Sequence, residues 1–175
     1  MVEKKLVISD LTLKYTGLFN LQELYYVIDR WSKEMAYDKE EHKHEVQVHS
    51  DGVTVNIDTR PYKKISDYIK HIVKCRIQGD KLKDVVVKVD GKETKLQEGT
   101  ITIILDGYQQ TDWEGKWVSN AFSYFLRTII DKYIYSGYLE NYESILKDHV
   151  KQLYAEISSY LNMNKYRFDP PKKKA

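Results

Sequence analysis

The sequence contains few of the residues that build disulfide scaffolds, long loops or membrane spans. It has one cysteine, Cys75, together with 3 prolines and 8 glycines in 175 residues. A single cysteine excludes an internal disulfide and favours a reducing compartment, so we expect the protein in the cytoplasm. No apolar run approaches the roughly 18 residues of a membrane-spanning helix. The start, MVEKKLVISD, does not have the pattern of a signal peptide.

Hydrophobic residues make up 42% and charged residues 31% of the chain, as in an ordinary globular protein. We therefore predict a single domain at residues 1–164. Residues 165–175 carry five basic side chains and one acidic one, and we expect them to form a disordered tail. Because the net charge of the whole chain is +2, the rest of the chain is close to neutral. Such a body does not indicate a nucleic-acid platform, which concentrates basic residues on one face.

Alternating and helical patterns predict the elements of the first part of the chain. Residues 11–15 alternate apolar and polar side chains, as a half-buried strand does. Residues 21–36 have apolar side chains at helical spacing, and Asn20 precedes them as an N-cap. Residues 44–58 alternate on both sides of an Asp-Gly pair, which predicts a β-hairpin.

The rest of the chain contains one ambiguous stretch. Residues 65–72 fit a strand or a helix, whereas the β-branched residues that follow favour a strand. Further strands are predicted at 84–89 and, beginning at Gly99, at 100–113. Two helical stretches are then expected, with a break at Gly137 between them. They span residues 121–133 and 139–161.

Together these elements predict an α+β fold. We expect a curved antiparallel sheet of six or seven strands, with a long C-terminal helix, broken at Gly137, packed across it. The strand residues expected on buried faces are Val46, Val48, Val53, Val55, Val73, Ile101 and Ile103. The helix residues expected deepest in the core are Phe122, Phe125, Leu126 and Ile129.

The late strand GTITIILDGYQQTDW leads into NAFSYFLRTIIDKY, near the end of the order strand, helix, antiparallel strands, helix. In a chain of this size, this order resembles the helix-grip superfamily, which includes START-like lipid carriers, polyketide cyclases and pollen-allergen-like proteins. The resemblance covers about residues 5–162, with one helix rather than two after the first strand. It implies a curved sheet that wraps the C-terminal helix, with a cavity between them. It implies no catalytic residue, because the superfamily has no universal catalytic motif.

The histidines near residue 45 do not form a metal-binding motif. His42, His44 and His49 lie close together in the sequence. No acid or cysteine completes a recognisable ligand spacing with them. We interpret them as surface histidines of a charged strand, and we predict no metal site and no cofactor.

His71 and Cys75 are four residues apart and therefore share one face of a strand or a helix. An imidazole beside a thiol can form a nucleophilic pair. The alternative is a buried core thiol beside a half-buried histidine, since free cysteine is commonly buried. We favour the second interpretation and predict no catalytic residue, so we expect that the protein is not an enzyme.

The stretch DGYQQTDWEGKW allows two interpretations. Gln109, Thr111 and Trp113 continue the inward alternation of the strand before them, so they would form the polar end of a cavity. His71 and Cys75 would join them from an earlier strand. Otherwise the stretch is a strand-to-helix junction, with its tryptophans packed beneath the start of the helix. The residues expected to face outward are Tyr108, Gln110 and Asp112.

These patterns suggest two functions. The first is a non-enzymatic binding protein that holds a small apolar or aromatic ligand between the sheet and the C-terminal helix. The second is an interaction module without a cavity, suggested by 15 tyrosines, many of them on the predicted helices. Such a module would bind a protein partner or a second copy of the chain, and its basic tail would contact RNA.

Overall fold

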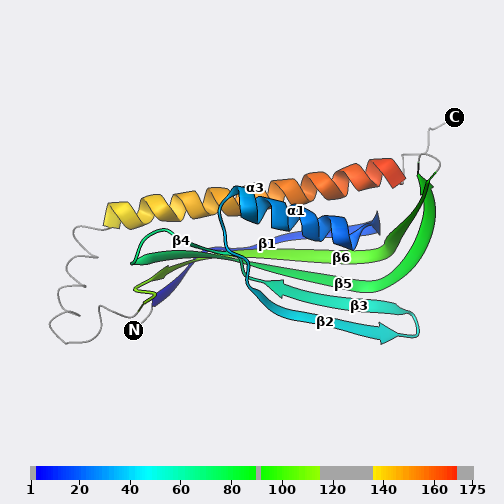
Figure 1. Cartoon of the computed structure of the whole chain (residues 1–175), viewed down its shortest axis with the longest axis horizontal. Coiled ribbons are helices and arrows are strands. Elements are labelled where there is room, and N and C mark those ends of the chain that lie inside the picture. Colours follow the sequence, from blue (N-terminus) through cyan, green and yellow to red (C-terminus); the bar gives the residue numbers. More distant parts are fainter. Residues whose placement is uncertain (1–2, 90–91, 115–135, 169–175) are drawn as a thin grey trace.

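Two helices lie on one face of a curved antiparallel sheet (Figure 1). The computed structural model describes residues 3–89, 92–114 and 136–168. The helices are α1 (Leu21–Glu34) and α3 (Ser136–Phe168). The strands are β1 (Glu3–Phe19), β2 (Glu41–His49), β3 (Gly52–Thr59), β4 (Tyr62–Lys64), β5 (Ile69–Val89) and β6 (Lys92–Thr111). The predicted α+β fold, with an antiparallel sheet of six strands, is confirmed.

The strands follow the order β1-β6-β5-β3-β2, and the short β4 pairs with the start of β5. The first strand thus lies beside the last, with Glu3 opposite Thr111 at one end of the pair and Phe19 opposite Gln97 at the other. The long hairpin of β5 and β6 curves toward the C-terminal end of α3 (Figure 1). We call the face that carries the helices the inner face, and the opposite one the outer face.

An irregularity in β5 accompanies the curvature of this hairpin. The pairing of β5 with β6 shifts between Asp80 and Lys83, and Lys81 has a φ of 53°. Leu82 packs beside Gly99, where a Cβ would lie 2.8 Å from the leucine Cδ2 and 3.0 Å from the Asp80 carbonyl oxygen. The prediction that Gly99 begins a strand is therefore wrong. This glycine lies inside β6 because the neighbouring strand approaches too closely for a side chain.

The helix α1 begins where the sequence predicts it. The Asn20 side chain accepts hydrogen bonds from the backbone N–H groups of Gln22 and Glu23, at 2.9 and 3.2 Å. This N-cap satisfies two of the donors that the first turn of a helix leaves without partners. The buried apolar residues of α1 are Leu24, Val27, Ile28 and Trp31, and they join the sheet and α3 in one core.

The helix α3 runs along the length of the sheet (Figure 1). It packs closely on β6, because a Cβ on Gly107 would lie 3.1 Å from Val150 Cγ2. Its buried apolar residues are Leu146, Val150, Leu153, Ile157 and Leu161. The close approach at Gly107 fixes where the helix rests on the strand.

The ends of α3 differ from the predicted boundaries. The helix begins at Ser136, next to the predicted break, and it continues to Phe168, past the predicted end of the domain at residue 164. The helix expected at residues 121–133 lies outside the described residues, and so does the tail from residue 169. The predicted core residues Phe122, Phe125, Leu126 and Ile129 belong to that part of the chain.

Most of the predicted strand core lies on the inner face. Val55, Val73, Ile101 and Ile103 are buried there, and Val53 is half-buried. The prediction for the two valines of β2 is wrong, since their exposed fractions reach 56% and 80%. These residues are Val46 and Val48. They belong to the strand at the edge of the sheet and, although they stand opposite Val55 and Val53, no described helix covers them.

The ambiguous residues 65–72 divide at Ile69. Before that residue the chain turns, and the Ser66 hydroxyl oxygen accepts hydrogen bonds from the backbone N–H groups of Tyr68 and Ile69. From Ile69 onward the chain forms β5, which pairs with β4 and β6. The strand predicted for the residues that follow this stretch is confirmed, and it begins earlier, at Ile69.

Candidate ligand-binding groove

A groove of about 620 Å³ lies between the start of α1 and the inner face of the sheet. Residues from α1, β2, β3 and β6 line it, so it exists only because these elements meet in space. The lining residues are Asn20, Leu21, Gln22, Tyr25, His44, Ile57, Lys95 and Gln97. None of them was predicted as a site residue, because they come from four separate stretches without a shared motif.

Hydrogen bonds hold the wall of the groove that α1 provides. The Gln97 side chain links α1 to the sheet: its Oε1 accepts from the Leu21 N–H at 3.0 Å, and its Nε2 donates to Asp84 Oδ1 at 3.0 Å. On the other side of the helix start, the Tyr160 hydroxyl of α3 donates to the Asn20 carbonyl oxygen at 2.8 Å. Burial raises the pKa of Tyr160 to about 12, so its hydroxyl stays a donor. The groove is therefore held open by contacts within the protein.

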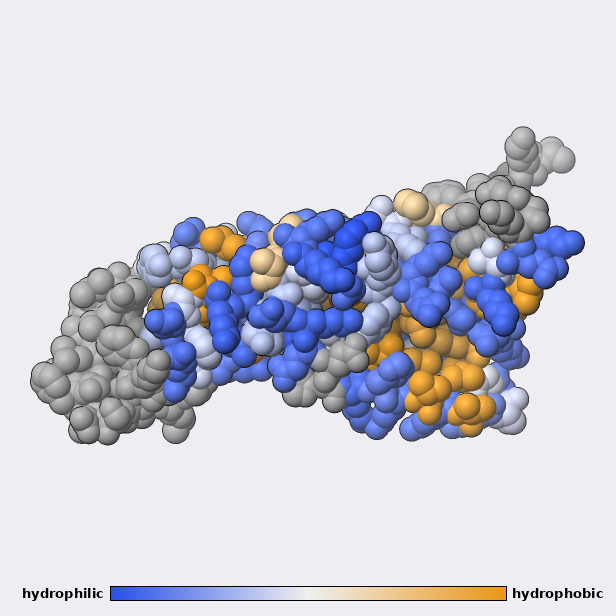
Figure 2. Space-filling view, viewed as in Figure 1, coloured by the Kyte–Doolittle hydropathy of each residue, from blue (hydrophilic) through white to orange (hydrophobic). Residues whose placement is uncertain are grey.

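The floor of the groove is apolar and continues beyond it. Ile57 is buried in the floor, and its neighbour on the inner face of β3, Val55, is buried as well. Val46 stands beside Val55 on β2. Figure 2 shows an apolar area over β2 and β3, below α1. An apolar molecule in the groove could therefore extend along uncovered valines of the sheet.

The rim of the groove carries positive charge. Lys95 lines it and is exposed. Lys39 Nζ lies 3.9 Å from the centre of the Tyr25 ring, but it is also 3.6 Å from Asp29 Oδ1, so Lys95 supplies the charge of the rim. None of the lining residues of this groove is acidic. An apolar floor beside a cationic rim suits a molecule with an apolar body and an anionic end.

A second, smaller cleft of about 270 Å³ lies at the other end of the sheet, beside the start of α3. Two of the predicted ligand-binding residues, Gln109 and Thr111, line it. The other lining residues are Glu3, Lys5, Leu139, Glu140 and Glu143. Lys5 Nζ lies 2.6 Å from Glu143 Oε1, which leaves the cleft with an excess of carboxylates. It is polar and acidic, unlike the larger groove.

His71 and Gln109 do meet, as neighbours on β5 and β6. Both are buried on the inner face, and His71 Nε2 lies 3.2 Å from Gln109 Oε1. The Tyr142 ring of α3 packs edge-on against the imidazole. Burial lowers the pKa of His71 to about 4, so the ring is neutral at physiological pH and its Nε2 can donate to the amide oxygen. The pair is a polar contact beneath a helix, and His71 Nδ1 is buried with no hydrogen-bond partner among the described residues.

Cys75 is further along the same face and is fully buried. Positions four apart on a strand are separated by about 13 Å, so the thiol cannot form a nucleophilic pair with His71. Burial also raises the pKa of the thiol to about 12, which keeps it protonated. Cys75 therefore packs as a small core residue, although the histidine is fully buried rather than half-buried.

Trp113 lies outside the lining of both the groove and the smaller cleft. Its Nε1 donates to the Ser66 carbonyl oxygen at 3.0 Å, so it holds the connection before β5. The expectation that Asp112 faces outward is wrong. This residue is buried, with a φ of 51°, and its backbone N–H donates to the Tyr68 carbonyl oxygen at 2.9 Å. The strand alternation ends at Thr111, and periodicity no longer applies beyond it.

No family model matches the chain, and no curated protein matches it. Within the described residues, no helix is long and apolar enough to span a membrane. The same part of the chain contains no group of three or more His, Cys, Asp and Glu residues that could hold a metal ion. The site itself, rather than a relative, must therefore indicate the function.

Proposed function

We propose that the protein binds a small, mostly apolar molecule with one anionic end in the groove beside α1. The observation that carries this proposal is the groove of about 620 Å³, with its apolar floor and cationic rim. Pockets for small molecules usually measure roughly 300–1,000 Å³ and combine apolar walls with a few polar groups. The smaller cleft does not have this composition, because its carboxylates would repel an anion.

The residues suggest how such a ligand would lie. Its apolar part would contact Ile57 and Leu21 and extend toward Val46. Its anionic end would face Lys95 at the rim. The resemblance to the helix-grip superfamily supports a ligand between sheet and helix, although here the wall is α1. The site predicted from the sequence, with Gln109 and Thr111 in the smaller cleft, stays a separate prediction for a mostly apolar ligand whose one polar end is held by hydrogen bonds.

The proposal can be tested with 8-anilinonaphthalene-1-sulfonate, whose aromatic body and sulfonate match the groove and whose fluorescence rises on binding. Decanoate should displace it. Lys95→Glu should weaken binding of both compounds about five- to tenfold, because it replaces an attraction with a repulsion. Lys14→Glu is the matched control, since Lys14 is exposed on the outer face of β1 and makes the same charge change. Unchanged affinity in Lys95→Glu would contradict the proposal.

A second variant tests the location of the ligand without relying on charge. Gln22 is exposed at the groove, so Gln22→Trp should fill its entrance and abolish displacement by decanoate. Gln109→Leu alters the smaller cleft and should have no effect. If Gln109→Leu abolishes binding and Gln22→Trp does not, the ligand occupies the smaller cleft. The melting temperature of each variant, compared with the wild type, separates lost binding from lost folding.

We also propose protein–protein interaction as a second candidate, because apolar side chains are exposed on both helices. Tyr26 on α1 is 64% exposed, and Tyr138 and Met163 on α3 are 47% and 65% exposed. Large exposed aromatic and methionine side chains are enriched at protein interfaces. Sedimentation equilibrium from 5 to 200 μM would detect a homodimer, which Tyr26→Ser should weaken. A strictly monomeric protein in this range would argue against self-association.

A further inference from the structure

One end of the outer face carries a row of basic side chains across four strands. Lys4 of β1 stands opposite Gln110 of β6, which stands opposite Lys70 of β5, which in turn stands opposite Lys64 of β4. Residues directly opposite one another in an antiparallel sheet point to the same face. Lys4 and Lys64 are exposed, and the two residues between them are half-buried. Three lysines thus flank one amide on this face.

A row of aromatic and aliphatic side chains lies beside the basic row. The pairing places Leu6 beside Tyr108, Tyr108 beside Ile72, and Ile72 beside Tyr62. Leu6 is 49% exposed, and the other three are half-buried. The two tyrosines are two strand spacings apart, about 10 Å. Two flat rings therefore alternate with aliphatic side chains on a surface that neither α1 nor α3 covers.

The ammonium groups of the basic row lie over aromatic rings. Lys4 Nζ is 4.2 Å from the centre of the Tyr108 ring, and Lys70 Nζ is 4.0 Å from that of Tyr62. Lys64 Nζ is 4.7 Å from the Trp113 ring. In the described part of the chain, none of these three lysines forms a salt bridge. The pKa of Lys4 is lowered by burial and then by the positive charges of Arg60 and Lys74. Positive charge at this end of the sheet is therefore in excess.

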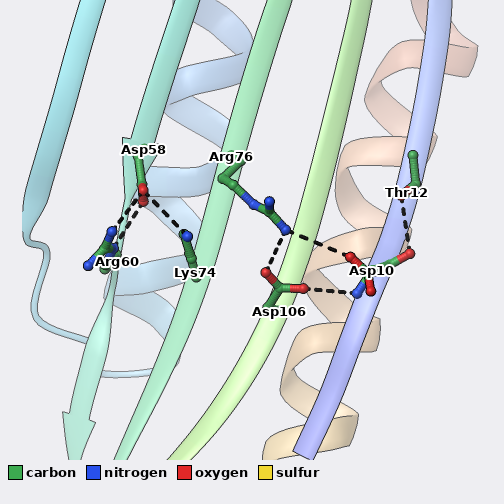
Figure 3. Close-up of polar contacts among 7 residues, drawn as sticks. All are labelled: Asp10, Thr12, Asp58, Arg60, Lys74, Arg76 and Asp106. Atoms are coloured by element: carbon green, nitrogen blue, oxygen red, sulfur yellow. Dashed lines mark hydrogen bonds and ion pairs between the residues drawn. The ribbon is translucent and has the colours of Figure 1, made fainter. Parts of the chain in front are cut away.

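The adjoining part of the outer face is different, because its charges neutralise one another (Figure 3). Arg76 Nη2 lies 2.8 Å from Asp106 Oδ2 and 3.8 Å from Asp10 Oδ1. Asp58 accepts two hydrogen bonds from Arg60 and lies 3.8 Å from Lys74 Nζ. Figure 3 also shows these side chains on the side of the sheet away from the helices. The basic row that begins at Lys4 thus carries a surplus of positive charge beside a part of the sheet whose charges balance.

We propose that these two rows bind single-stranded RNA. Lysines supply contacts to phosphates, and tyrosine rings supply platforms on which bases stack. In a duplex the base faces are already stacked, so only a single strand could use the rings. Gln110, in the middle of the basic row, has an amide that can both donate to and accept from a ribose 2′-hydroxyl. On binding, the ammonium groups of Lys4 and Lys70 would move from the rings to the phosphates.

The first test measures binding of the full chain to a fluorescein-labelled 12-nucleotide oligouridine by fluorescence anisotropy, at 50 and 200 mM NaCl. Binding should weaken as salt rises, because phosphate contacts release counterions. Lys70→Glu should weaken binding at least tenfold and reduce the salt dependence. Lys147→Glu, at an exposed position of α3, should leave the affinity unchanged. If both variants lose affinity equally, the binding is unspecific attraction to positive charge and the proposal is wrong.

The second test addresses stacking and the location of the strand. Tyr108→Ala should weaken oligouridine binding about five- to hundredfold, as loss of a stacking platform does, whereas Tyr108→Phe should retain it. A duplex RNA of the same length should bind less tightly. Equal binding of the duplex, or an unchanged affinity in Tyr108→Ala, would overturn the proposal.

Binding that is lost on deletion of residues 170–175 but unaffected by Lys70→Glu would also overturn it, since the tail would then be the site. Preferential binding of polyglutamate over RNA would identify an acidic protein as the partner instead.

Discussion

The two faces of the β5–β6 hairpin differ sharply, although alternate residues of the same two strands form them. On the inner face of β5, His71, Val73, Cys75 and Ile77 are fully buried. The residues that alternate with them point to the outer face, are half-buried and are mostly cationic: Lys70, Ile72, Lys74 and Arg76. The helices α1 and α3 exclude water from the inner face, and neither of them covers the outer face. A polar group on the inner face must therefore find its partner within the protein, whereas charges on the outer face can remain available for a ligand.

A matched pair of substitutions tests this difference directly. Ile103 is buried on the inner face of β6, and Ile104, the next residue, is half-buried on the outer face. Ile103→Ala should lower the free energy of unfolding by about 2–5 kcal/mol, because it leaves a cavity beneath the helices. Ile104→Ala should cost about 1 kcal/mol or less. Urea denaturation measures both, and equal losses would show that the outer face is also covered.

The inner face should also impose a pH dependence through His71. Its pKa in the folded protein is about 4, below the ordinary value of 6.5, because the buried ring resists protonation. The unfolded state therefore binds the proton more readily between these values. Stability should be fully present above pH 6.5 and fall as the pH approaches 4, by up to about 3 kcal/mol from this group.

The histidine contribution can be separated from that of the carboxylates with a variant. His71→Gln keeps a polar side chain but does not titrate, so its free energy of unfolding should change less between pH 7 and pH 4.5 than that of the wild type. Chemical denaturation at each pH measures the difference. Parallel pH profiles for the two proteins would mean that the imidazole is already protonated, or solvated, in the folded state.

On the outer face the largest electrostatic effect is expected at Arg76. Its partner Asp106 is only 4% exposed, so Arg76→Ala would leave a buried carboxylate that still accepts a hydrogen bond from the Asp10 N–H. The expected loss is about 1–3 kcal/mol. Arg60→Ala, which removes one of the partners of the better solvated Asp58, should cost at most about 1 kcal/mol. Thermal denaturation at low and high salt measures both losses. A larger loss for Arg60→Ala than for Arg76→Ala would contradict the assigned burial of the two aspartates.

The smallest effect is expected where the inner face is no longer covered. Val46 and Val55 are opposite one another on β2 and β3, yet Val46 is 56% exposed and Val55 is 5% exposed. Val46→Ala should change the free energy of unfolding by no more than about 0.5 kcal/mol. Val55→Ala should cost about 1–2 kcal/mol, in line with lost apolar burial. A large loss for Val46→Ala would indicate that another segment or molecule covers the edge strand.

The local patterns of the sequence predicted several of the elements, but not the start of β6 or the end of α3. Asn20 marks the start of α1, and the alternation around Asp51-Gly52 predicts the β2–β3 hairpin. They were not sufficient for the sites. Gln109 and His71 do meet, because both lie on strands whose inward phase periodicity defines. Trp113 and Asp112 follow the end of β6, where a turn replaces the alternation.

The groove and the basic row could not be read from any one stretch of the chain. The groove combines Leu21, Ile57 and Lys95, and the row combines Lys4, Lys64 and Lys70. Both depend on which residues of different strands stand opposite one another. The slightly negative charge of the body as a whole argued against a nucleic-acid surface, because a net charge does not reveal how charges are distributed among faces.

The sequence by itself determined the α+β class, the helix start at Asn20 and the inward alternation of the strands, since each depends on residues within one turn or one strand. The tertiary structure alone decided which apolar residues the helices bury and which polar residues of different strands lie side by side. Val46 and Val55 have the same side chain, and both alternate with polar residues along their strands. One is buried and the other exposed because the described helices cover β3 but not β2. The register between strands, shifted by the irregularities of β1 and β5, aligned Lys4, Lys70 and Lys64 in one row. Strand pairing joins residues that are far apart in the chain, and a local sequence pattern does not specify which of them will pair.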